Sequence, residues 1–271
     1  RIPILSSIVR KKVLKGLGLQ SVRFAGSGSA PIPGSVIEWY RKLGLELLEG
    51  YGMTENFAYS HVSMPGKSRV GYVGNTYPGV EHRIGDDGEI LVKSPGDMMG
   101  YYKEPEMTRA SFTDDGFFKT GDQGEIDAEG RLRITGRTKE IFKCGKGKYI
   151  APAPIENLLN AHDHLEMSCV TGAGMSQPFA LVQLSEALRG TTDDDERRAE
   201  VKTTLRGLLD RVNAALEHHE RLQFLVVVTE EWTMEAGLLT PTLKIKRQAV
   251  EDRYAANVEG WYDQNEAILW A

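Results

Sequence analysis

The chain has 271 residues, of which 41% are hydrophobic and 26% charged, enough for one large or two ordinary globular cores. Its formal net charge of −5 leaves no basic excess, which argues against nucleic acid or an anionic membrane as an electrostatic partner. The longest purely apolar run, residues 224–228, is far shorter than the about 20 residues of a membrane-spanning helix and predicts a buried strand.

Helices and strands are predicted to alternate in the first part of the chain. Apolar spacing predicts an amphipathic helix over residues 4–18 and a second helix over 34–43. Short strands are predicted at residues 22–24 and 45–48, each followed by a glycine-rich loop. This order is typical of a parallel α/β sheet, in which ligands bind at the carboxyl ends of the strands. Both loops are therefore expected at one ligand-binding edge.

After about residue 70 the pattern changes to short alternating segments separated by Gly and Asp. They predict antiparallel hairpins of a small sheet or barrel, at residues 80–84, 88–93, 124–127 and 130–134.

From about residue 139 onward the pattern predicts a mixture of helices and strands. The predicted helices cover residues 154–160 and 193–219, and the predicted strands lie near 169–171, 179–183 and 222–229. We place the domain boundary between Arg137 and Lys143, which makes residues 1–137 the end of a large domain and 138–271 a small α+β domain.

The stretch LLEGYGMTE combines groups that suit a nucleotide. Gly50 and Gly52 let the backbone turn tightly and approach a ligand. Tyr51 offers a flat ring, Thr54 a hydroxyl and Glu55 a hard oxygen ligand of the kind that Mg²⁺ uses beside substrate phosphates. The alternative is a plain glycine turn with a surface carboxylate.

Three later residues carry groups that complement such a site. Asp122 ends a strand at a glycine turn, where its carboxylate could accept both hydroxyls of a ribose, although an ordinary turn aspartate has the same pattern. Arg137 could contact ribose or phosphate, or form a surface ion pair. Lys244 follows a rigid turn at Pro241, as a catalytic point charge would, or it belongs to a solvated basic strand.

Six segments together resemble the adenylate-forming enzymes, also called the AMP-binding superfamily, and within it the long-chain fatty-acyl-CoA synthetases. Each segment alone is a weak signal, but all six occur in the family's order. They are GSGSAPIP (26–33), EGYGMTE (49–55), GEILVKSPGDMMGYYKEPE (88–106), DGFFKTGD (115–122), GRTKEIFKCGKGKYIAPAPIE (136–156) and LTPTLKIKR (239–247). The fold implied is the end of a large adenylate-forming domain, with a parallel-sheet segment and a small antiparallel β-barrel, followed by a small mobile α+β domain.

The resemblance implies roles for the matching residues of the large domain. Residues of two loops would surround the adenine: Gly28, Ser29, Ala30 and Pro31 line it, Tyr51 stacks on it, and Gly52 and Met53 close the loop. Thr54 would hold phosphate and Glu55 would hold Mg²⁺. Asp122 would take the ribose hydroxyls, helped by Arg137.

Four residues of the small domain also acquire roles from the resemblance. Lys139 matches the hinge between the domains, and Lys143 follows in the linker. Gly147 matches the glycine that approaches the CoA arm, and Lys244 matches the lysine that reaches into the site during adenylation.

The implied activity is an acid–thiol ligase reaction. ATP would activate a fatty acid to an acyl-adenylate, and transfer to CoA would give acyl-CoA, AMP and pyrophosphate, with Mg²⁺ as cofactor and no nucleic acid as partner. Two alternatives stay open: an acyl-AMP ligase that loads a carrier protein, and a non-catalytic fragment. Cys144 and Cys169, without a signal-peptide pattern, predict a reducing cytoplasmic setting without a disulfide, and peripheral membrane contact is left open.

The sequence departs from the family in one respect. The Ser/Thr/Gly-rich loop that grips the β- and γ-phosphates is not found, and the chain starts at Arg1, so we expect it to be the carboxyl half of a longer enzyme that is inactive by itself. A truncated sheet would expose an edge, which predicts self-association or loose order in the first ~60 residues. The pairs His162/His164 and His218/His219 lack metal-binding spacing, so no histidine metal site is expected.

Overall fold

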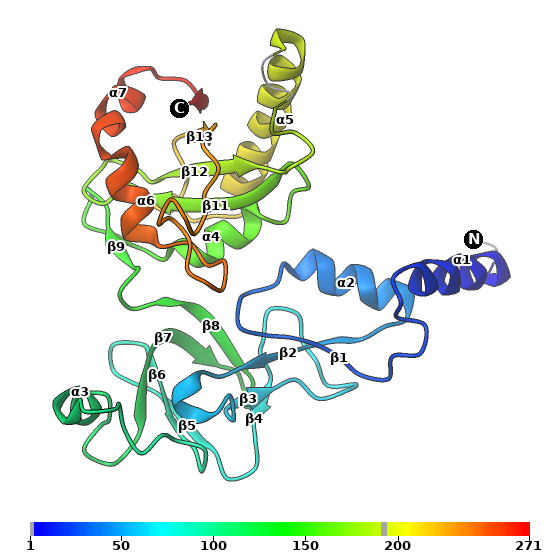
Figure 1. Cartoon of the computed structure of the whole chain (residues 1–271), viewed down its shortest axis with the longest axis vertical. Helices are drawn as coiled ribbons and strands as arrows, with labels where there is room; N and C mark the ends of the chain where they lie inside the picture. The colour runs from blue at the N-terminus through cyan, green and yellow to red at the C-terminus, as the bar shows by residue number, and fades with distance from the viewer. Residues whose placement is uncertain (1–2, 191–193) are drawn as a thin grey trace. The chain divides into compact units, whose positions relative to one another are not determined.

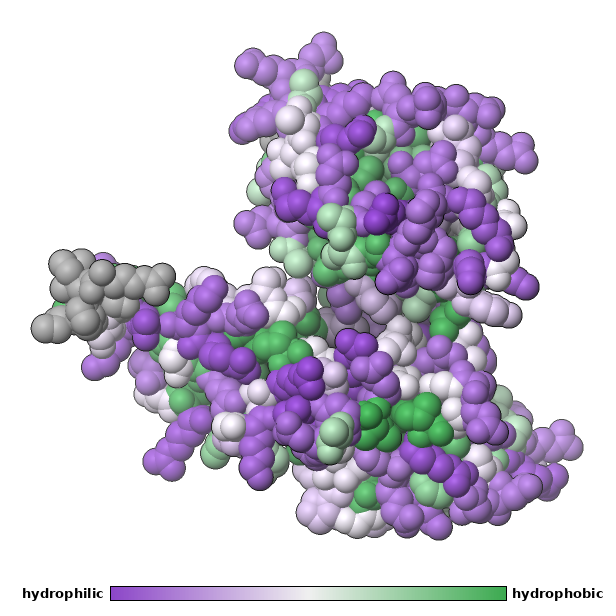
Figure 2. All heavy atoms as spheres, turned by 180° about the vertical axis from the view of Figure 1, so that it is seen from behind, coloured by the Kyte–Doolittle hydropathy of each residue, from purple (hydrophilic) through white to green (hydrophobic). Residues whose placement is uncertain are grey.

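The computed structural model describes residues 3–190 and 194–271. The chain divides into two compact units, Arg1–Thr138 (unit 1) and Lys139–Ala271 (unit 2) (Figure 1). Among the described residues, every helix is too short or too polar to span a bilayer. The face seen in Figure 2 is mainly hydrophilic, with separate hydrophobic patches.

Unit 1 begins with the predicted alternation of helices and strands. Helices α1 (Pro3–Gly16) and α2 (Gly34–Leu43) accompany the parallel pair β1 (Ala25–Ser27) and β2 (Leu47–Tyr51), as predicted. Gly44, in the left-handed region at φ 92°, ends α2. Strands β3 (His61–Val62) and β4 (Asn75–Thr76) extend the sheet in the order β1-β2-β3-β4.

Both strands of the parallel pair start later than the sequence predicts. The segment 22–24 is not a strand, because the Val22 amide donates to the Leu19 carbonyl in a turn after α1. The amide of Leu45 donates to the Tyr40 carbonyl, so this apolar residue closes the end of α2 instead of opening β2. The predicted ranges 22–24 and 45–48 were therefore wrong by two to three residues, although the parallel pairing is confirmed.

The second sheet of unit 1 consists of antiparallel hairpins, as predicted. Its strands, in the order β5-β6-β7-β8, are β5 (Glu81–Ile84), β6 (Glu89–Lys93), β7 (Phe118–Ile126) and β8 (Leu132–Arg137). The third strand, β7, covers residues 118–126 and not 124–127, so the prediction that Asp122 ends a strand was wrong: Asp122 lies inside the strand and pairs with Arg137. No pairing of described residues joins β5 to β8, so the sheet is open. The short helix α3 (Pro105–Ala110) lies in the connection from β6 to β7. The core of this part is small and consists of Val80, Ile90, Val92 and Leu132.

Unit 2 is a mixed sheet covered by helices on both faces. The strands, in the order β11-β12-β13-β14, are β11 (Leu165–Thr171), β12 (Phe179–Leu184), β13 (Leu225–Val228) and β14 (Ile268–Trp270), and only β11 and β12 pair antiparallel. Alternate residues of β12 enter two cores: Ala180 and Val182 pack with α4 (Pro152–Leu159) and α5 (Asp195–Ala214), whereas Phe179 and Leu181 pack with α6 (Arg247–Tyr254) and α7 (Val258–Asp263).

The described residues also form a small two-stranded hairpin and two 3-10 turns. They are the strands β9 (Phe142–Lys143) and β10 (Tyr149–Ile150), which form a hairpin, and the 3-10 turns η1 (Thr54–Asn56) and η2 (Ala255–Asn257). Cys144 and Cys169 are buried free thiols.

The long helix of unit 2 is shorter than predicted. Its predicted first residue, 193, lies outside the described residues, and α5 starts after its cap, Asp194, whose side chain accepts from two backbone amides of the first turn. The prediction that the helix reaches residue 219 was wrong. The side chain of Asn213 donates to the Leu222 carbonyl and accepts from the Leu222 amide, at 2.8 Å each, so the chain turns back there. Helices α6 and α7 and strand β14 were not predicted from the sequence.

Candidate functional site

Three residues that the sequence singled out meet in unit 1. The Tyr51 hydroxyl, at the end of β2, donates to Oδ2 of Asp122 at 2.6 Å. Nε of Arg137, opposite Asp122 in the β7–β8 register, donates to Oδ1 at 2.9 Å. Asp122 is buried and the Arg137 side chain is exposed. One carboxylate is therefore held between the tyrosine hydroxyl of one sheet and an accessible cation on the neighbouring strand of its own sheet.

The environment keeps Tyr51 a hydrogen-bond donor. Burial, together with the charge of Asp122, raises the pKa of the Tyr51 hydroxyl far above its usual value. Each oxygen of the Asp122 carboxylate accepts one bond from a side chain and has a further lone pair. The pair of oxygens can thus accept two additional hydroxyl groups.

The turn that carries Thr54 and Glu55 is tightly closed. The Ala58 amide donates to the Met53 carbonyl at 2.8 Å, and a Cβ at Gly52 would lie 2.6 Å from the Ala58 Cα, so only glycine fits there. Thr54 is exposed. The turn is therefore present as predicted, and it requires glycine at position 52 because the backbone of Ala58 lies so close.

Glu55 is held by a residue that the sequence analysis did not single out. The Tyr101 hydroxyl donates to Glu55 Oε1 at 2.9 Å, and the Met98 amide donates to the Glu55 carbonyl at 2.7 Å. Burial and this hydrogen bond raise the pKa of Tyr101, which keeps its hydroxyl a donor. Tyr101 belongs to the segment GEILVKSPGDMMGYYKEPE, but its distance of 46 residues from Glu55 left no local signal.

The two glycine-rich loops lie at the same edge of the first sheet. Strands β1 and β2 run parallel, so the segment after Ser27 and the segment after Tyr51 leave the sheet in the same direction. The backbones approach closely, because a Cβ at Gly28 would lie 3.1 Å from the Gly50 carbonyl oxygen. Ser29 adopts a left-handed φ of 68°, and Ala30 and Pro31 are exposed.

Unit 2 presents Lys244 on a compact turn. The Thr240 amide donates to the Lys244 carbonyl at 2.8 Å, and the Lys244 amide donates to the Thr240 hydroxyl at 3.0 Å. Leu243, at φ 59°, allows the reversal. Leu239 is buried beneath the turn, whereas Lys244 is exposed. The predicted basic segment is therefore a turn that displays Lys244, followed by the exposed Lys246, and not a strand.

The other predicted residues of unit 2 lie near its start. Lys139 is the first residue of the unit, and Lys143 ends β9, with its Nζ 5.7 Å from the centre of the Tyr149 ring. Gly147 occupies the β9–β10 turn at φ 79° and its amide donates to the Cys144 carbonyl at 2.8 Å. Among the described residues, no hydrogen bond or ion pair joins this turn to that of Lys244.

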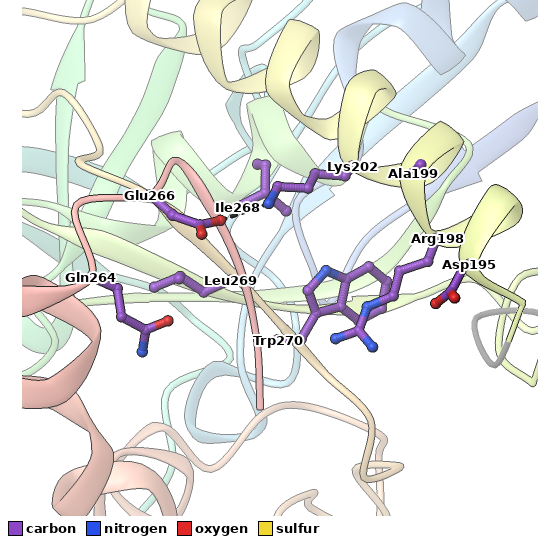
Figure 3. A pocket seen from close by; sticks show the side chains of 9 residues that line it. All are labelled: Asp195, Arg198, Ala199, Lys202, Gln264, Glu266, Ile268, Leu269 and Trp270. Carbon is purple, nitrogen blue, oxygen red and sulfur yellow. Dashed lines mark hydrogen bonds and ion pairs between the residues drawn. The ribbon is translucent and has the colours of Figure 1, made fainter.

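Unit 2 also has a shallow depression of about 400 Å³ between α5 and β14 (Figure 3). The Arg198 guanidinium lies 4.5 Å from the Trp270 ring, and Lys202 pairs with Glu266 at 2.6 Å. None of the predicted site residues lines it.

A metal site built by the protein alone is not found among the described residues, which contain no group of three suitable His, Cys, Asp or Glu side chains. The His162 and His164 rings are in edge contact, with centroids 5.0 Å apart. A single carboxylate, Glu55, nevertheless fits Mg²⁺, which uses one or two carboxylates together with substrate phosphates.

Comparison with known proteins covers most of the chain. Residues 3–102 match the family model of the AMP-binding enzymes, and residues 140–266 match that of the AMP-binding enzyme C-terminal domain. The long-chain-fatty-acid–CoA ligase FadD15 of Mycobacterium bovis is 34% identical over 96% of this chain and 45% of its own length.

Solved structures are similar over the same extent. The adenylation domain of a Mycobacterium chelonae carboxylate reductase has a TM-score of 0.77 and 25% identity, covering 96% of this chain and 42% of that one. The A-PCP didomain of a Segniliparus rugosus carboxylic acid reductase, in complex with AMP, has a TM-score of 0.76 and 26% identity, covering 95% and 37%. The chain thus spans less than half the length of these relatives.

Proposed function

Because this chain belongs to the family of AMP-binding enzymes, we propose that the protein containing it activates a fatty acid with ATP and transfers the acyl group to CoA. The products would be acyl-CoA, AMP and pyrophosphate. The adenylate-forming fold class predicted from the sequence is confirmed by the solved structures of the same fold.

The observation that carries the proposal is the cluster of Tyr51, Asp122 and Arg137. Its buried carboxylate has both oxygens oriented by protein donors at 2.6 and 2.9 Å and free to accept again. A cis-diol presents two donors to such a group, which suits the ribose of ATP. The exposed Arg137 would add a positive charge close to the nucleotide.

The phosphates would lie at the turn of Thr54 and Glu55. The Thr54 hydroxyl is available as a donor, and the Glu55 oxygen that Tyr101 does not occupy would be a ligand for Mg²⁺. Mg²⁺, when bound, would neutralise part of the phosphate charge. Gly28, Ser29, Ala30 and Pro31, with Tyr51, Gly52 and Met53, would enclose the adenine.

Adenylation is an attack of the fatty carboxylate on the α-phosphorus of ATP. The new bond joins a carboxylate oxygen to phosphorus, and the bond to the bridging oxygen of pyrophosphate breaks. Negative charge on the transferring group must be stabilised, and an exposed lysine on a preorganised turn can supply this. We assign that role to Lys244.

Thioester formation is the second half-reaction. The CoA sulfur would attack the acyl carbonyl, its proton would leave to solvent, and AMP would depart. Gly147, in an open turn at φ 79°, would admit the CoA arm, and Lys139 with Lys143 would serve as hinge and linker between the half-reactions.

A carrier-protein thiol is the second candidate acceptor. The similarity to an A-PCP didomain favours this reading, because that protein carries a PCP beside its A domain. Comparing CoA with a pantetheine-bearing carrier protein as the acceptor distinguishes the two.

The test is carboxylic-acid-dependent release of pyrophosphate from Mg-ATP. It uses the extended protein, defined as this chain preceded by the upstream segment that its longer relatives carry, and acids from acetate to oleate. Release that requires a medium or long acid is expected, and Lys244→Ala should abolish it while sparing thioester formation from supplied acyl-adenylate. If no acid in the panel causes release of pyrophosphate, the result would favour a non-catalytic protein. Cell fractionation would test the cytoplasmic location that we propose with it.

A further inference from the structure

A buried arginine lies immediately after the Lys244 turn. Arg247 is the first residue of α6, and only 14% of its side chain is exposed. Its Nη1 lies 2.8 Å from Glu156 Oε1 and its Nη2 lies 3.0 Å from Oε2, which is a bidentate pair. A guanidinium so deeply placed is tolerated only when its charge is paired, and both of its terminal nitrogens are bonded here, whereas the buried Nε has no hydrogen-bond partner among the described residues.

The pair also closes the edge of the sheet. Val170 lies on β11, the outer strand, and its amide donates to Glu156 at 2.7 Å while its carbonyl accepts from Arg247 at 2.8 Å. The two side chains thereby satisfy backbone groups that an edge strand would otherwise leave unpaired. Helices α4 and α6 are joined to β11 at one point.

A third contact reaches the beginning of unit 2. Nη2 of Arg247 lies 3.5 Å from Oε2 of Glu140, the residue after the proposed hinge Lys139. The Lys246 amide donates to the Leu238 carbonyl at 2.9 Å, which closes the Lys244 turn directly before Arg247. The turn is therefore continuous with a rigid, ion-paired anchor.

We propose that Arg247 is a positioning residue that fixes the Lys244 turn to Glu156 and to Glu140, so that the lysine and the segment after the hinge move as one body. The inference rests on the proposed role of Lys244 in adenylation. Lysine cannot replace the arginine, because its single ammonium group cannot form the bidentate pair and reach Glu140 as well.

The first test measures the two half-reactions of Arg247→Lys in the extended protein. A displacement of about 1 Å in a catalytic group can cost roughly 100-fold, so we expect acid-dependent pyrophosphate release to fall about 10- to 100-fold. Thioester formation from supplied acyl-adenylate does not use Lys244 and should change by less than about threefold. Glu156→Gln should show the same selective loss.

The matched control is Arg253→Lys. Arg253 lies on the same helix and also forms a bidentate pair, with Glu230 at 3.0 and 2.7 Å, but its side chain is 57% exposed and it contacts no part of the Lys244 turn. Both half-reactions should remain as in the wild type. Equal loss of both half-reactions in Arg247→Lys, or no loss in either, would overturn the proposal.

A second measurement does not depend on activity. Amide hydrogen exchange on the whole chain should accelerate about tenfold or more at Lys244 and Lys246 in Arg247→Lys, while amides of β12 and β13 keep their wild-type rates. Uniform acceleration across unit 2, or none at Lys244 and Lys246, contradicts the anchoring. If the wild type releases no pyrophosphate with any acid, the proposed function fails, and the exchange pattern still decides whether Arg247 holds the turn.

Discussion

Asp122 illustrates how one carboxylate can be both part of the fold and ready for a ligand. Its two oxygens accept from Tyr51 and Arg137, its own amide donates to the Thr120 hydroxyl at 3.1 Å, and it is 9% exposed. These contacts fix the direction of the remaining lone pairs. A ligand with two hydroxyl groups therefore meets an acceptor that needs no reorganisation.

Replacing Asp122 by Asn tests this arrangement. The amide nitrogen would face a donor, either Tyr51 or Arg137, and the charge would be lost. Hydrogen bonds to charged groups contribute roughly 1.5–3 kcal/mol, so the KM for ATP should rise about 10- to 100-fold in the extended protein. Asp127→Asn is the control. Asp127 forms ion pairs with Arg69 and Arg131 at the β7–β8 turn, so the substitution should lower thermal stability and leave the KM for ATP unchanged.

Glu49 and Glu46 should give opposite pH dependences of stability. Burial raises the pKa of Glu49 from 4.5 to about 7, so its contribution is fully present below pH 4.5 and is lost as the pH rises through 7. Hydrogen bonds from Ser68 and Gly66 lower the pKa of Glu46, so its contribution is present above pH 4.5 and is lost as the pH falls through its lowered pKa.

Thermal unfolding of two glutamine variants at pH 5 and pH 8 measures this difference. The thermal midpoint of Glu49→Gln minus that of the wild type should be more positive at pH 8 than at pH 5, because the glutamine never ionises, whereas Glu49 does. Glu46→Gln should be less stable than the wild type at both pH values, because both lie above the lowered pKa of Glu46, and a third measurement at about pH 3 should show a smaller deficit. The same shift for both variants at both pH values would contradict the assignment.

At the scale of elements, the sequence predicts correctly those helix ends that nearby residues determine. Helix α2 has its predicted bounds because a strong apolar stripe ends at Gly44. Strand ends were misplaced because Val22 and Leu45 are apolar but satisfy their amides in turns. Tyr51, Asp122 and Arg137 were identified by motif, whereas Tyr101 was missed because its bond to Glu55 spans 46 residues and joins two segments outside the strands.

The Gly52 turn gives an element-scale prediction. An alanine Cβ would lie 2.6 Å from the Ala58 Cα and 2.8 Å from its carbonyl carbon, so Gly52→Ala must open the turn that presents Thr54 and Glu55. Overpacking of this kind costs about 1–3 kcal/mol. We expect a lower thermal midpoint and weaker binding of Mg-ATP by the extended protein, measured by calorimetry. Gly26→Ala, whose Cβ would come no closer than 3.9 Å to the Leu48 carbonyl oxygen, should bind Mg-ATP normally.

At the scale of the whole molecule, the first sheet of unit 1 ends in an unprotected edge. Strand β1 pairs only with β2 among the described strands, and Phe24, directly before it, is 73% exposed. Trp39 on α2 is 45% exposed. An edge strand beside exposed aromatic surface is a template for pairing with another chain. The chain spans less than half the length of its longer relatives, and we propose that a segment of the kind those relatives carry outside the matched part covers that edge.

We therefore expect this 271-residue chain alone to associate through β1, and the extended protein not to use that edge for association. Sedimentation velocity should show concentration-dependent association that Phe24→Lys reduces, because a charge at a strand edge opposes pairing. Met234→Lys introduces the same charge at a residue of unit 2 that is 44% exposed and should leave association unchanged. A compact monomer at all concentrations, with slowly exchanging amides at residues 25–27, would show that the edge is stable without a partner.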